Sequence, residues 1–415
     1  MFSLAKVAAL LGVLTPKDLV VCQFEIDSRR IGHGGLFFAL CGNRVCGEDF
    51  LSEVACNGGV AAIVSNDYCG LDYGLVLLKV DNVIESLHRL AKAVLLERRT
   101  RIIGVTGSVG KTTIKEFIYH LISQKYNVYK NPMSFNSQVT LPIVILNAKG
   151  DEDFIVLEMA MSKKGDISRL IDIAPPDIVV LGQITYCHAE NFSNLEGIAA
   201  SKSEIFNKKV KFSVIHEESA KFDVVLKACK SDRVVYPSSF PIKLPFHETH
   251  FVENFSAAYE VAKYLGVKDK EIECMVDSFK MNDHRFQKKQ INGVTFIDDA
   301  YNANPASSIA AFKNLPKPSK NCKKIAVFGA MGELGKFSLE SHRIVGEVAV
   351  QEIDELLCIG DECDVMVDIF CKHGKFARKF KGYDELKNAM NNSACNGDVV
   401  LLKGSNYHKL WEFLQ

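Results

Sequence analysis

Hydrophobic positions in the middle of the chain fall into short unbroken runs separated by helical patterns. The runs cover residues 102–105, 154–157 and 178–181. An unbroken apolar run of this length is typical of a strand that is buried on both faces. Strands of this kind that alternate with helices predict an α/β fold, with a parallel sheet covered by helices on both sides.

The order of the patterns divides the chain into three predicted domains. Residues 1–96 contain strand candidates at 35–40 and 60–64 and end in a helical pattern over 83–96. Residues 97–283 hold the three central runs, and the predicted helices there follow the first run and cover 254–265, before Gly266. Residues 284–415 carry further strand candidates at 294–297, 324–328, 355–359 and 398–402. We therefore expect a small α/β N-terminal domain, a central parallel-sheet domain and a C-terminal α/β domain.

Composition and charge exclude several classes of function. The chain has 415 residues, of which 47% are hydrophobic, and its 50 basic residues balance 50 acidic ones. No overall field draws it to nucleic acid or to an anionic membrane. No apolar run approaches the roughly 20 residues that span a bilayer, and residues 1–12 predict an amphipathic surface helix rather than a signal peptide. We expect a cytoplasmic, monomeric protein that acts on small molecules, with no nucleic-acid partner and no membrane insertion.

The cysteines suggest a reducing compartment. There are 13, scattered along the chain, and none falls in a C-x-x-C pair. This pattern argues against a disulfide framework and against a structural zinc site. We expect free thiols that serve as small buried hydrophobic residues.

A glycine-rich loop, G-V-T-G-S-V-G-K-T-T at 104–113, follows the first central strand. Backbone N–H groups in such a loop, followed by a helix N-terminus, bind phosphate, while the Lys reaches the outer phosphates and a hydroxyl reaches Mg²⁺. The alternative is a glycine-rich turn that binds nothing. The loop predicts a site for ATP and Mg²⁺ formed by Gly107, Ser108, Gly110, Lys111, Thr112 and Thr113.

The spacing of this loop departs from the general pattern G-x-x-x-x-G-K-[ST]. Val105 stands at the position of the first Gly, and Gly104 comes one residue early. Residues 106–113 match T-G-[ST]-x-G-K-T-T, the loop of the Mur ligases, and the chain resembles this family over its whole length. The resemblance implies a three-domain ligase with a Rossmann-like C-terminal domain. It also implies an ATP-dependent acid–amino-acid ligase, of EC 6.3.2 type.

Two side chains follow the central strands at the edge where open α/β sheets bind ligands. Glu158 ends the second strand and His188 comes after the third. From the residues alone, Glu158 is a Mg²⁺ ligand or a helix cap, and His188 is a ligand or a surface residue. The resemblance implies that both bind metal with Thr112. It also implies that Lys202 is a metal ligand when carbamylated, and the alternative is an exposed helix lysine.

The resemblance supplies two further nucleotide contacts. Asn254 resembles the Asn that contacts adenine, and Arg285 resembles the Arg that reaches the ATP phosphates from the third domain. A guanidinium suits phosphate because its fixed fork matches the phosphate oxygens. Without the family, both would be read as surface residues. The catalytic set implied in this way is Lys111, Glu158, His188, Lys202 and Arg285.

The substrate end of the resemblance rests on D-D-A-Y-N-A-N-P at 298–305, directly after an apolar strand. This stretch resembles the branch of the family that joins D-Ala-D-Ala to UDP-N-acetylmuramoyl-tripeptide. Segments 27–29, 328–335 and 402–405 resemble the same branch, whereas a turn rich in Asn and Pro would explain 298–305 alone. The substrate residues implied are Asp27, Ser28, Arg29, Asp299, Asn302, Asn304 and Ser405.

The implied reaction belongs to peptidoglycan synthesis, and thus to cell wall biogenesis, cell shape and cell division. The tripeptide carboxylate takes a phosphoryl group from ATP, and the amine of D-Ala-D-Ala then displaces phosphate to give the UDP-MurNAc-pentapeptide. Another Mur-type ligase, adding the third peptide residue or acting as a folylpolyglutamate synthase, is the alternative within the class. A P-loop nucleotide switch is the alternative outside it. The third residue of the acceptor peptide stays open.

Several positions differ from the family pattern. They concern fine substrate contacts more than phosphate chemistry, because each difference removes a polar partner or a special backbone position. The differing residues are Cys46, Glu48, Ser137, Thr140, Ala160, Ala330 and Asn406.

Overall fold

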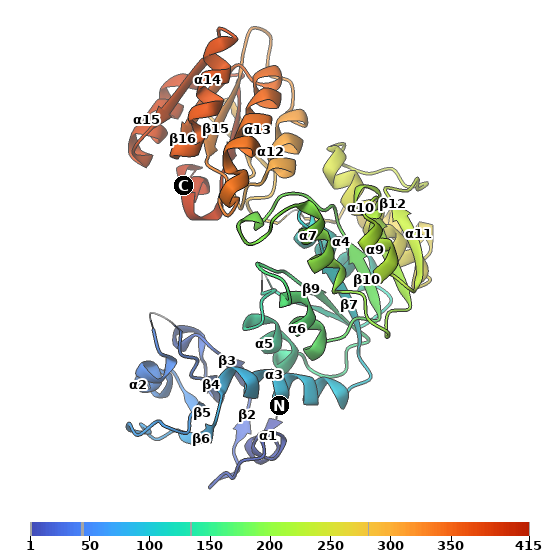
Figure 1. The fold of residues 1–415 in the computed structure, drawn as a ribbon, viewed down its shortest axis with the longest axis vertical. Coiled ribbons are helices and arrows are strands. Elements are labelled where there is room, and N and C mark those ends of the chain that lie inside the picture. The colour runs from blue at the N-terminus through green and yellow to red at the C-terminus, as the bar shows by residue number, and fades with distance from the viewer. Residues whose placement is uncertain (1, 43–44, 133–134, 281, 415) are drawn as a thin grey trace.

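The computed structural model describes residues 2–42, 45–132, 135–280 and 282–414. They form three lobes in chain order, each built around a sheet (Figure 1). The N-terminal lobe (β1–β6) lies at one end of the molecule, the central lobe (β7–β12) in the middle and the C-terminal lobe (β13–β18) at the other end. The predicted α/β class is confirmed. The predicted boundaries at 96/97 and 283/284 stay predictions.

The N-terminal lobe combines a parallel sheet of order β3-β4-β5-β6 with an antiparallel β1-β2 pair. Its strands are β1 (Phe2–Ser3), β2 (Val20–Val21), β3 (Gln23–Glu25), β4 (Gly35–Phe38), β5 (Gly59–Ser65) and β6 (Val76–Val80). Its helices are α1 (Leu4–Leu11), η1 (Ser28–Arg30), η2 (Gly47–Phe50), α2 (Leu51–Cys56) and α3 (Val83–Leu96). Helix α3 has the predicted bounds, and its buried stripe packs against the central lobe through α5 (Thr140–Asn147).

The central lobe is a six-stranded parallel sheet of order β12-β11-β10-β7-β9-β8. Its strands are β7 (Arg101–Thr106), β8 (Val128–Lys130), β9 (Phe154–Glu158), β10 (Ile178–Leu181), β11 (Phe212–His216) and β12 (Asp232–Tyr236). Its other helices are α4 (Lys111–Ile122), α6 (Asp166–Ile173), η3 (Ala189–Asn191), α7 (Leu195–Ser203), α8 (Glu217–Ala220), α9 (Asp223–Ala228), α10 (Thr249–Tyr264) and α11 (Asp269–Val276).

Helices cover both faces of this central sheet, as the unbroken apolar runs predicted. Along β9, Phe154 and Val156 join the core under α4 and α10, while Ile155 and Leu157 join the core under α5 and α6. Successive side chains of a strand point to opposite faces, so a strand buried on both faces must be apolar throughout.

Helix α10 begins earlier than its pattern predicts. It starts at Thr249 instead of residue 254. Phe251 and Phe255 are both buried and lie one turn apart, so the helical spacing exists there. The polar residues Thr249 and His250 before Phe251, and Glu253 after it, interrupt the apolar pattern there.

The C-terminal lobe has a sheet of order β13-β14-β18-β15-β16-β17, in which only the β13–β14 pair is antiparallel. Its strands are β13 (Gln287–Ile291), β14 (Val294–Asp298), β15 (Lys324–Gly329), β16 (Glu355–Ile359), β17 (Phe376–Phe380) and β18 (Val399–Lys403). Its helices are α12 (Pro305–Lys313), η4 (Gly335–Phe337), α13 (Ser338–Glu352), η5 (Asp361–Cys363), α14 (Asp364–Lys372), α15 (Tyr383–Ser393), η6 (Asn406–His408) and η7 (Leu410–Leu414).

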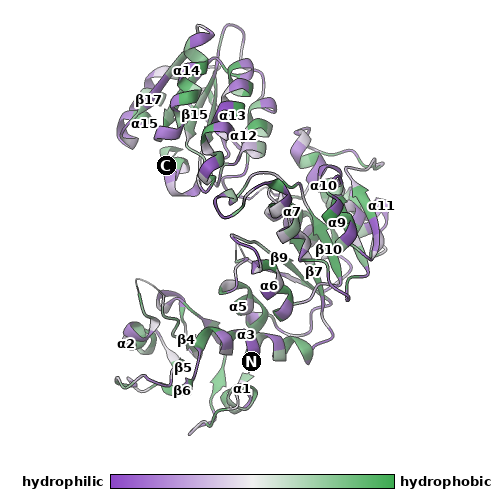
Figure 2. Cartoon of the chain, viewed as in Figure 1, coloured by the Kyte–Doolittle hydropathy of each residue, from purple (hydrophilic) through white to green (hydrophobic). Residues whose placement is uncertain are grey.

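Hydropathy follows this layering. In Figure 2 the strands inside the lobes are mostly hydrophobic, and the helices that cover them carry both hydrophobic and hydrophilic positions. Within the described residues, every helix is too short or too polar to cross a lipid bilayer.

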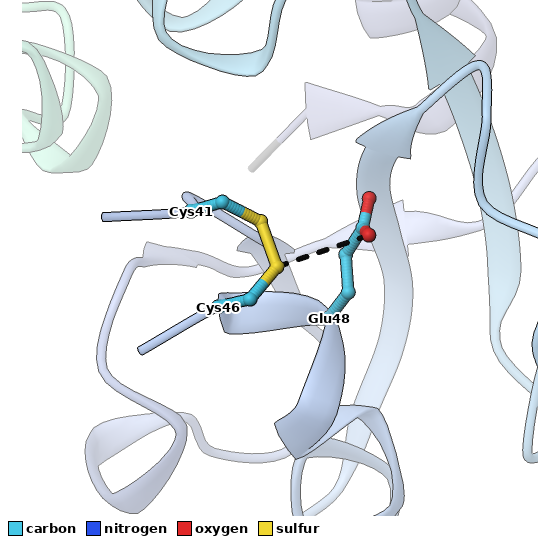
Figure 3. A group of neighbouring side chains, drawn as sticks. All are labelled: Cys41, Cys46 and Glu48. Carbon is cyan, nitrogen blue, oxygen red and sulfur yellow. Dashed lines mark hydrogen bonds between the residues drawn. A yellow bond between two sulfur atoms is a disulfide. The ribbon is translucent and has the colours of Figure 1, made fainter. Parts of the chain in front are cut away.

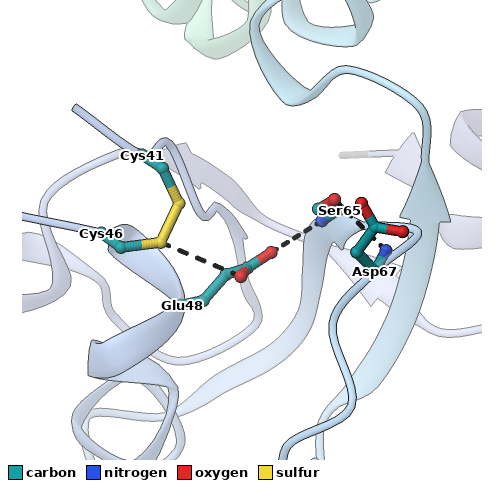
Figure 4. Close-up of a disulfide and its surroundings, with 5 residues drawn as sticks. All are labelled: Cys41, Cys46, Glu48, Ser65 and Asp67. Carbon is teal, nitrogen blue, oxygen red and sulfur yellow. Dashed lines mark hydrogen bonds between the residues drawn. A yellow bond between two sulfur atoms is a disulfide. The ribbon is translucent and has the colours of Figure 1, made fainter. Parts of the chain in front are cut away.

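The cysteine prediction was wrong for one pair and for the exposed thiols, whereas Cys187, Cys229, Cys358 and Cys363 are free and buried as expected. Cys41 and Cys46 form a disulfide across the loop between β4 and η2, beside the carboxylate of Glu48 (Figure 3). Glu48 also accepts a hydrogen bond from the backbone N–H of Ser65 at 2.8 Å (Figure 4). The free cysteines at the surface are Cys22, Cys56, Cys69, Cys274, Cys371 and Cys395. Sequence spacing missed the disulfide because an isolated antiparallel bridge places Cys41 opposite Cys46.

The core behind the glycine-rich loop offers a test of the packing. Phe117 of α4 is 1% exposed, stacks on Phe279 with ring centroids 4.1 Å apart and meets Phe255 edge-on. Phe117→Ala should lower the free energy of unfolding by about 3–5 kcal/mol, because it leaves a cavity. Urea unfolding followed by circular dichroism measures this change. Exposed Leu96→Ala is the control, expected within about 0.5 kcal/mol of the unsubstituted chain; equal losses in both variants would contradict the packing.

Candidate functional site

The glycine-rich loop connects β7 to α4 and lies tightly against its neighbours. A Cβ atom at Gly107 would lie 2.9 Å from the Cα atom of Gly182. A Cβ atom at Gly110, where φ is +77°, would lie 2.2 Å from Oδ1 of Asn254. The loop thus needs glycine at both positions, for close backbone approach and for a left-handed conformation.

Hydrogen bonds tie this loop to the ends of the neighbouring strands. The N–H of Met159 donates to the carbonyl of Val105 at 2.8 Å, and the N–H of Gly182 donates to the carbonyl of Thr106 at 2.7 Å. The hydroxyl of Ser108 donates to the carbonyl of Thr185 at 2.8 Å. The carboxyl ends of β7, β9 and β10 therefore lie together, and their following residues surround the loop.

Glu158 is a buried carboxylate that faces the first turn of α4. It is 2% exposed, and it accepts hydrogen bonds from the hydroxyl of Thr112 at 2.8 Å and from the side-chain amide of Asn136 at 2.7 Å. Both donors are side chains, whereas a helix cap accepts from backbone N–H groups, so these contacts do not match the helix-cap alternative. Asn136 was not assigned from the sequence, although it lies in a stretch that resembles the family pattern. The oxygens of Glu158 and Thr112 are of the type that Mg²⁺ prefers.

Arg285 reaches this group from the start of the C-terminal lobe. Its Nη2 donates to the Thr112 hydroxyl oxygen at 3.1 Å, and its guanidinium lies 4.2 Å from the centre of the Tyr301 ring. Thr112 therefore connects a carboxylate of the central lobe to a permanent cation of the next lobe.

His188 forms a second link between the two lobes. It pairs with Glu333, and the N–H of Glu190 donates to the carbonyl of Glu333 at 3.2 Å. Hydrogen bonds to Cys187 and Glu333 raise the pKa of His188 to about 9, against the effect of burial. Burial alone would raise the pKa of Cys187, but His188 lowers it to about 7. With this raised pKa, His188 is a cation near pH 7 in this arrangement. Only a neutral imidazole binds a metal ion, so His188 must lose a proton before it can act as a ligand.

Lys202 is buried beneath the loop. It is 1% exposed, which contradicts the alternative of an exposed helix lysine, and its Nζ donates to the carbonyl of Gly107 at 2.9 Å. Burial, and then the charge of Lys111, lower the pKa of Lys202 to about 7. The ammonium of Lys111 donates to the same carbonyl at 3.1 Å. A large share of Lys202 is thus neutral near pH 7, and the neutral amine is the form that CO₂ carbamylates.

The D-D-A-Y-N-A-N-P stretch forms the opposite wall. Asp299 pairs with Nζ of Lys403 at 2.7 Å, and Lys403 is 1% exposed. Oδ1 of Asn304 caps α12 by accepting a hydrogen bond from the N–H of Ser307 at 2.9 Å. This local role is the one expected if the stretch is a turn rich in Asn and Pro. The side-chain oxygen of Asn302 accepts from the N–H of Ala303. Lys403 was not assigned from the sequence, although the segment 402–405 that contains it was.

Ser405 and the N-terminal candidates make local contacts. The Ser405 hydroxyl oxygen accepts from the N–H of Gly332 at 2.6 Å. Asp27 caps η1 and pairs with Arg29 at 2.7 Å, while the Ser28 hydroxyl donates to Glu53 at 2.6 Å. Asp27, Ser28 and Arg29 belong to the N-terminal lobe, whereas Ser405 follows β18 in the C-terminal lobe.

Two cavities bring most of the other candidates together. A cavity of about 560 Å³ between the central and C-terminal lobes is lined by Ser108, Gly110, Lys111, Thr112, Glu158, His188, Arg285, Asp299, Asn302 and Asn304. A neighbouring cavity of about 120 Å³ is lined by Thr113 and Asn254, together with His216, Tyr236 and His250. The candidates that line neither are Asp27, Ser28, Arg29, Gly107, Lys202 and Ser405.

Comparison with known families matches both halves of this site. Residues 105–276 match the Mur ligase middle domain, and residues 284–406 match the Mur ligase glutamate ligase domain. The UDP-N-acetylmuramoyl-tripeptide–D-alanyl-D-alanine ligase of Bacillus subtilis is 30% identical over 428 residues, covering 96% of this chain and 93% of that protein. The ligase of the same name from Borreliella burgdorferi is 27% identical, covering 96% and 94%.

Solved structures agree with these relatives. The MurF ligase from Thermotoga maritima in complex with ADP is 30% identical, with a TM-score of 0.80 over 96% of this chain and 97% of that one. MurF from Acinetobacter baumannii is 23% identical, with a TM-score of 0.86 over 99% and 97%. At 23% identity, the similarity to the Acinetobacter baumannii protein shows a shared fold and nothing more.

The buried lysine gives a pH-dependent prediction. The pKa of Lys202 is about 7 in the folded chain and near the ordinary value of 10.5 in the unfolded chain. Between these values the unfolded chain binds more protons, so raising the pH stabilises the fold. Lys202→Met should lack this gain. The melting temperature of the wild type, minus that of the variant, should therefore rise from pH 7 to pH 9; a constant or falling difference would contradict the lowered pKa.

Proposed function

The chain belongs to the Mur ligase family, and we propose that it joins D-Ala-D-Ala to UDP-N-acetylmuramoyl-tripeptide, converting ATP to ADP and phosphate. The observation that carries this proposal is the cavity of about 560 Å³ between two lobes. The phosphate loop forms one of its walls and the Asp299–Lys403 pair lies on another. A phosphoryl donor and an incoming amine can thus meet at one carboxyl group. Relatives named for this reaction, matched over nearly their whole length, support it.

The first step uses the cations around the loop. An oxygen of the tripeptide carboxylate attacks the γ-phosphorus of ATP, the bond to the bridging oxygen breaks, and ADP leaves. Lys111 and Arg285 stabilise the charge that spreads over the transferred phosphoryl group. Thr113 and Asn254, at the smaller cavity, hold the rest of the nucleotide, and Gly107, Ser108 and Gly110 supply the loop that cradles the phosphates.

The metal site in this proposal is built on oxygens. Thr112 and Glu158 fit Mg²⁺, because both offer oxygen and the buried carboxylate supplies negative charge. Bound Mg²⁺ supplies charge neutralisation for the ATP phosphates. The family resemblance implies two further ligands. His188 becomes a ligand once it loses the proton that Glu333 stabilises, and Lys202 becomes one once it is carbamylated.

The second step forms the peptide bond. The dipeptide amine attacks the acyl-phosphate carbonyl carbon, the carbon–oxygen bond to phosphate breaks, and the amine loses a proton. Asp299 and Asn302 hold the dipeptide or the intermediate, with Lys403 fixing the carboxylate of Asp299. The side-chain amide of Asn304, whose Oδ1 caps α12, and the loop around Ser405 complete this wall. Positioning of this kind supplies much of the catalysis in such reactions.

The N-terminal lobe takes the UDP-sugar in this proposal, through Asp27, Ser28 and Arg29. These residues belong to a different lobe from the phosphate loop, which suits a substrate whose nucleotide end lies far from its reacting carboxylate. ATP and UDP-linked precursors are cytoplasmic metabolites, so the reaction belongs in the cytoplasm. Each proposed group comes from one chain, so a monomer suffices.

Phosphate release tests the substrate assignment. With ATP, Mg²⁺ and the UDP-muramoyl-tripeptide, release should depend on D-Ala-D-Ala, because the acyl phosphate is consumed only by the amine. Replacing the dipeptide with glutamate tests the other ligases of the family and should give little release. Release without any dipeptide, or equal release with glutamate, would overturn the assignment.

Lys111→Ala tests the phosphate loop. Loss of the ammonium should lower kcat/KM at least about 100-fold, roughly 2.7 kcal/mol of transition-state stabilisation, while leaving the melting temperature nearly unchanged. Lys208→Ala, at an exposed position of the same lobe, is the matched control and should keep full activity. Retained turnover in Lys111→Ala would remove the loop from the mechanism.

A further inference from the structure

Arg285 lies between two residues with an uncommon backbone conformation. His284 has φ of +58° and Phe286 has φ of +53°. Bulky residues other than glycine rarely adopt this left-handed region, because it is sterically strained for a side chain with a Cβ atom. Surrounding contacts must therefore hold this segment in place.

Those contacts come from the stretch that begins at Asp298. The side chain of Asp298 is fully buried, and its Oδ2 lies 2.8 Å from Nδ1 of His284. The N–H of Tyr301 donates to the carbonyl of His284 at 3.1 Å, and the N–H of Phe286 donates to Oδ1 of Asp299 at 3.1 Å. Both left-handed residues are thus fixed by neighbours in one short segment.

Aromatic contacts hold the segment from its other sides. The His284 ring stacks on Trp411, the chain's single tryptophan, with ring centroids 4.8 Å apart and planes at 23°. The Phe286 ring is buried against His250 and Phe251. Nζ of Lys289, on the neighbouring strand β13, lies 3.3 Å from Oδ2 of Asp298. The Asp298 carboxylate therefore contacts both His284 and Lys289.

We propose that Asp298 and His284 are positioning residues, which act by fixing the backbone that presents Arg285 to Thr112. The inference rests on the proposed function in so far as Arg285 meets the ATP phosphates. The residues that line the two cavities include Arg285 but neither Asp298 nor His284. Asp298 and His284 can therefore act on nucleotide only through a neighbouring residue, and Arg285, which directly follows His284, is the neighbour that donates to Thr112. A guanidinium on a loose linker would lose more conformational freedom on meeting phosphate, which weakens binding.

A double-mutant cycle tests this dependence. Binding of Mg²⁺ and the non-hydrolysable ATP analogue AMP-PNP is measured by calorimetry for Asp298→Ala, Arg285→Ala and the double variant. Asp298→Ala should raise Kd about tenfold in the wild-type background and less than about twofold in the Arg285→Ala background. Equal changes in the two backgrounds, or no change in either, would overturn the inference.

A second variant guards against a folding defect in Asp298→Ala. His284→Gly relieves the left-handed strain but loosens the linker and removes the ring from Trp411, so it should also raise Kd. Asn321→Gly is its matched control, because Asn321 is a left-handed residue (φ +64°) elsewhere in the C-terminal lobe, and its Kd should not change. Equal Kd values for His284→Gly and the wild type would count against the proposal.

Hydrogen exchange separates this inference from the proposed function. Without nucleotide, amide exchange in residues 284–287 should be at least about tenfold faster in His284→Gly and Asp298→Ala than in the wild type. Trp411 fluorescence should change in both variants. Unchanged exchange would overturn the inference even if the enzyme bound ATP. A wild-type chain that bound no nucleotide would overturn the proposed function, while the exchange comparison would still decide this point.

Discussion

The site depends on the meeting of two sheet edges. Strands β7, β9 and β10 run parallel, so their carboxyl ends place the phosphate loop, Glu158 and the segment leading to His188 along one edge. In the C-terminal lobe, β14 and β18 also run parallel and end at Asp298 and Lys403. These two edges bound the same cavity. The hydrogen bond from Arg285 to Thr112 and the His188–Glu333 pair hold them together in this arrangement. Charged groups from separate lobes are thereby concentrated around one reacting centre.

The sequence predicted the parts of this site that depend on local pattern. The phosphate loop and the ends of β9 and β10 follow from apolar runs and glycines close in the chain, as do the bounds of α3 outside the site. The buried state of Lys202, the Asp299–Lys403 pair and the Cys41–Cys46 disulfide were not predicted. Each depends on segments brought together by packing or by a backbone bridge, which residue type and spacing do not encode. Helix α10 falls between these cases, because polar residues interrupt its apolar spacing.

The departures from the family pattern have local replacements. The hydroxyls of Ser137 and Thr140 lie 3.0 Å apart in hydrogen-bonding contact, and the N–H of Ala160 donates to the carbonyl of Asn136. The side-chain amide of Asn406 donates to the carbonyl of Tyr301 at 3.0 Å. These contacts keep the walls of the cavity in place without the usual residues.

The central claim is that one carboxyl group first receives a phosphoryl group and then an amine within the cavity between the lobes. Oxygen-18 in the terminal carboxylate of the UDP-muramoyl-tripeptide follows this directly, with mass spectrometry of the phosphate released on adding ATP, Mg²⁺ and D-Ala-D-Ala. An acyl phosphate transfers one labelled oxygen from the carboxylate to that phosphate. Labelled phosphate formed together with the pentapeptide product is the result expected here. Unlabelled phosphate would show that water attacks ATP instead, and would contradict the account.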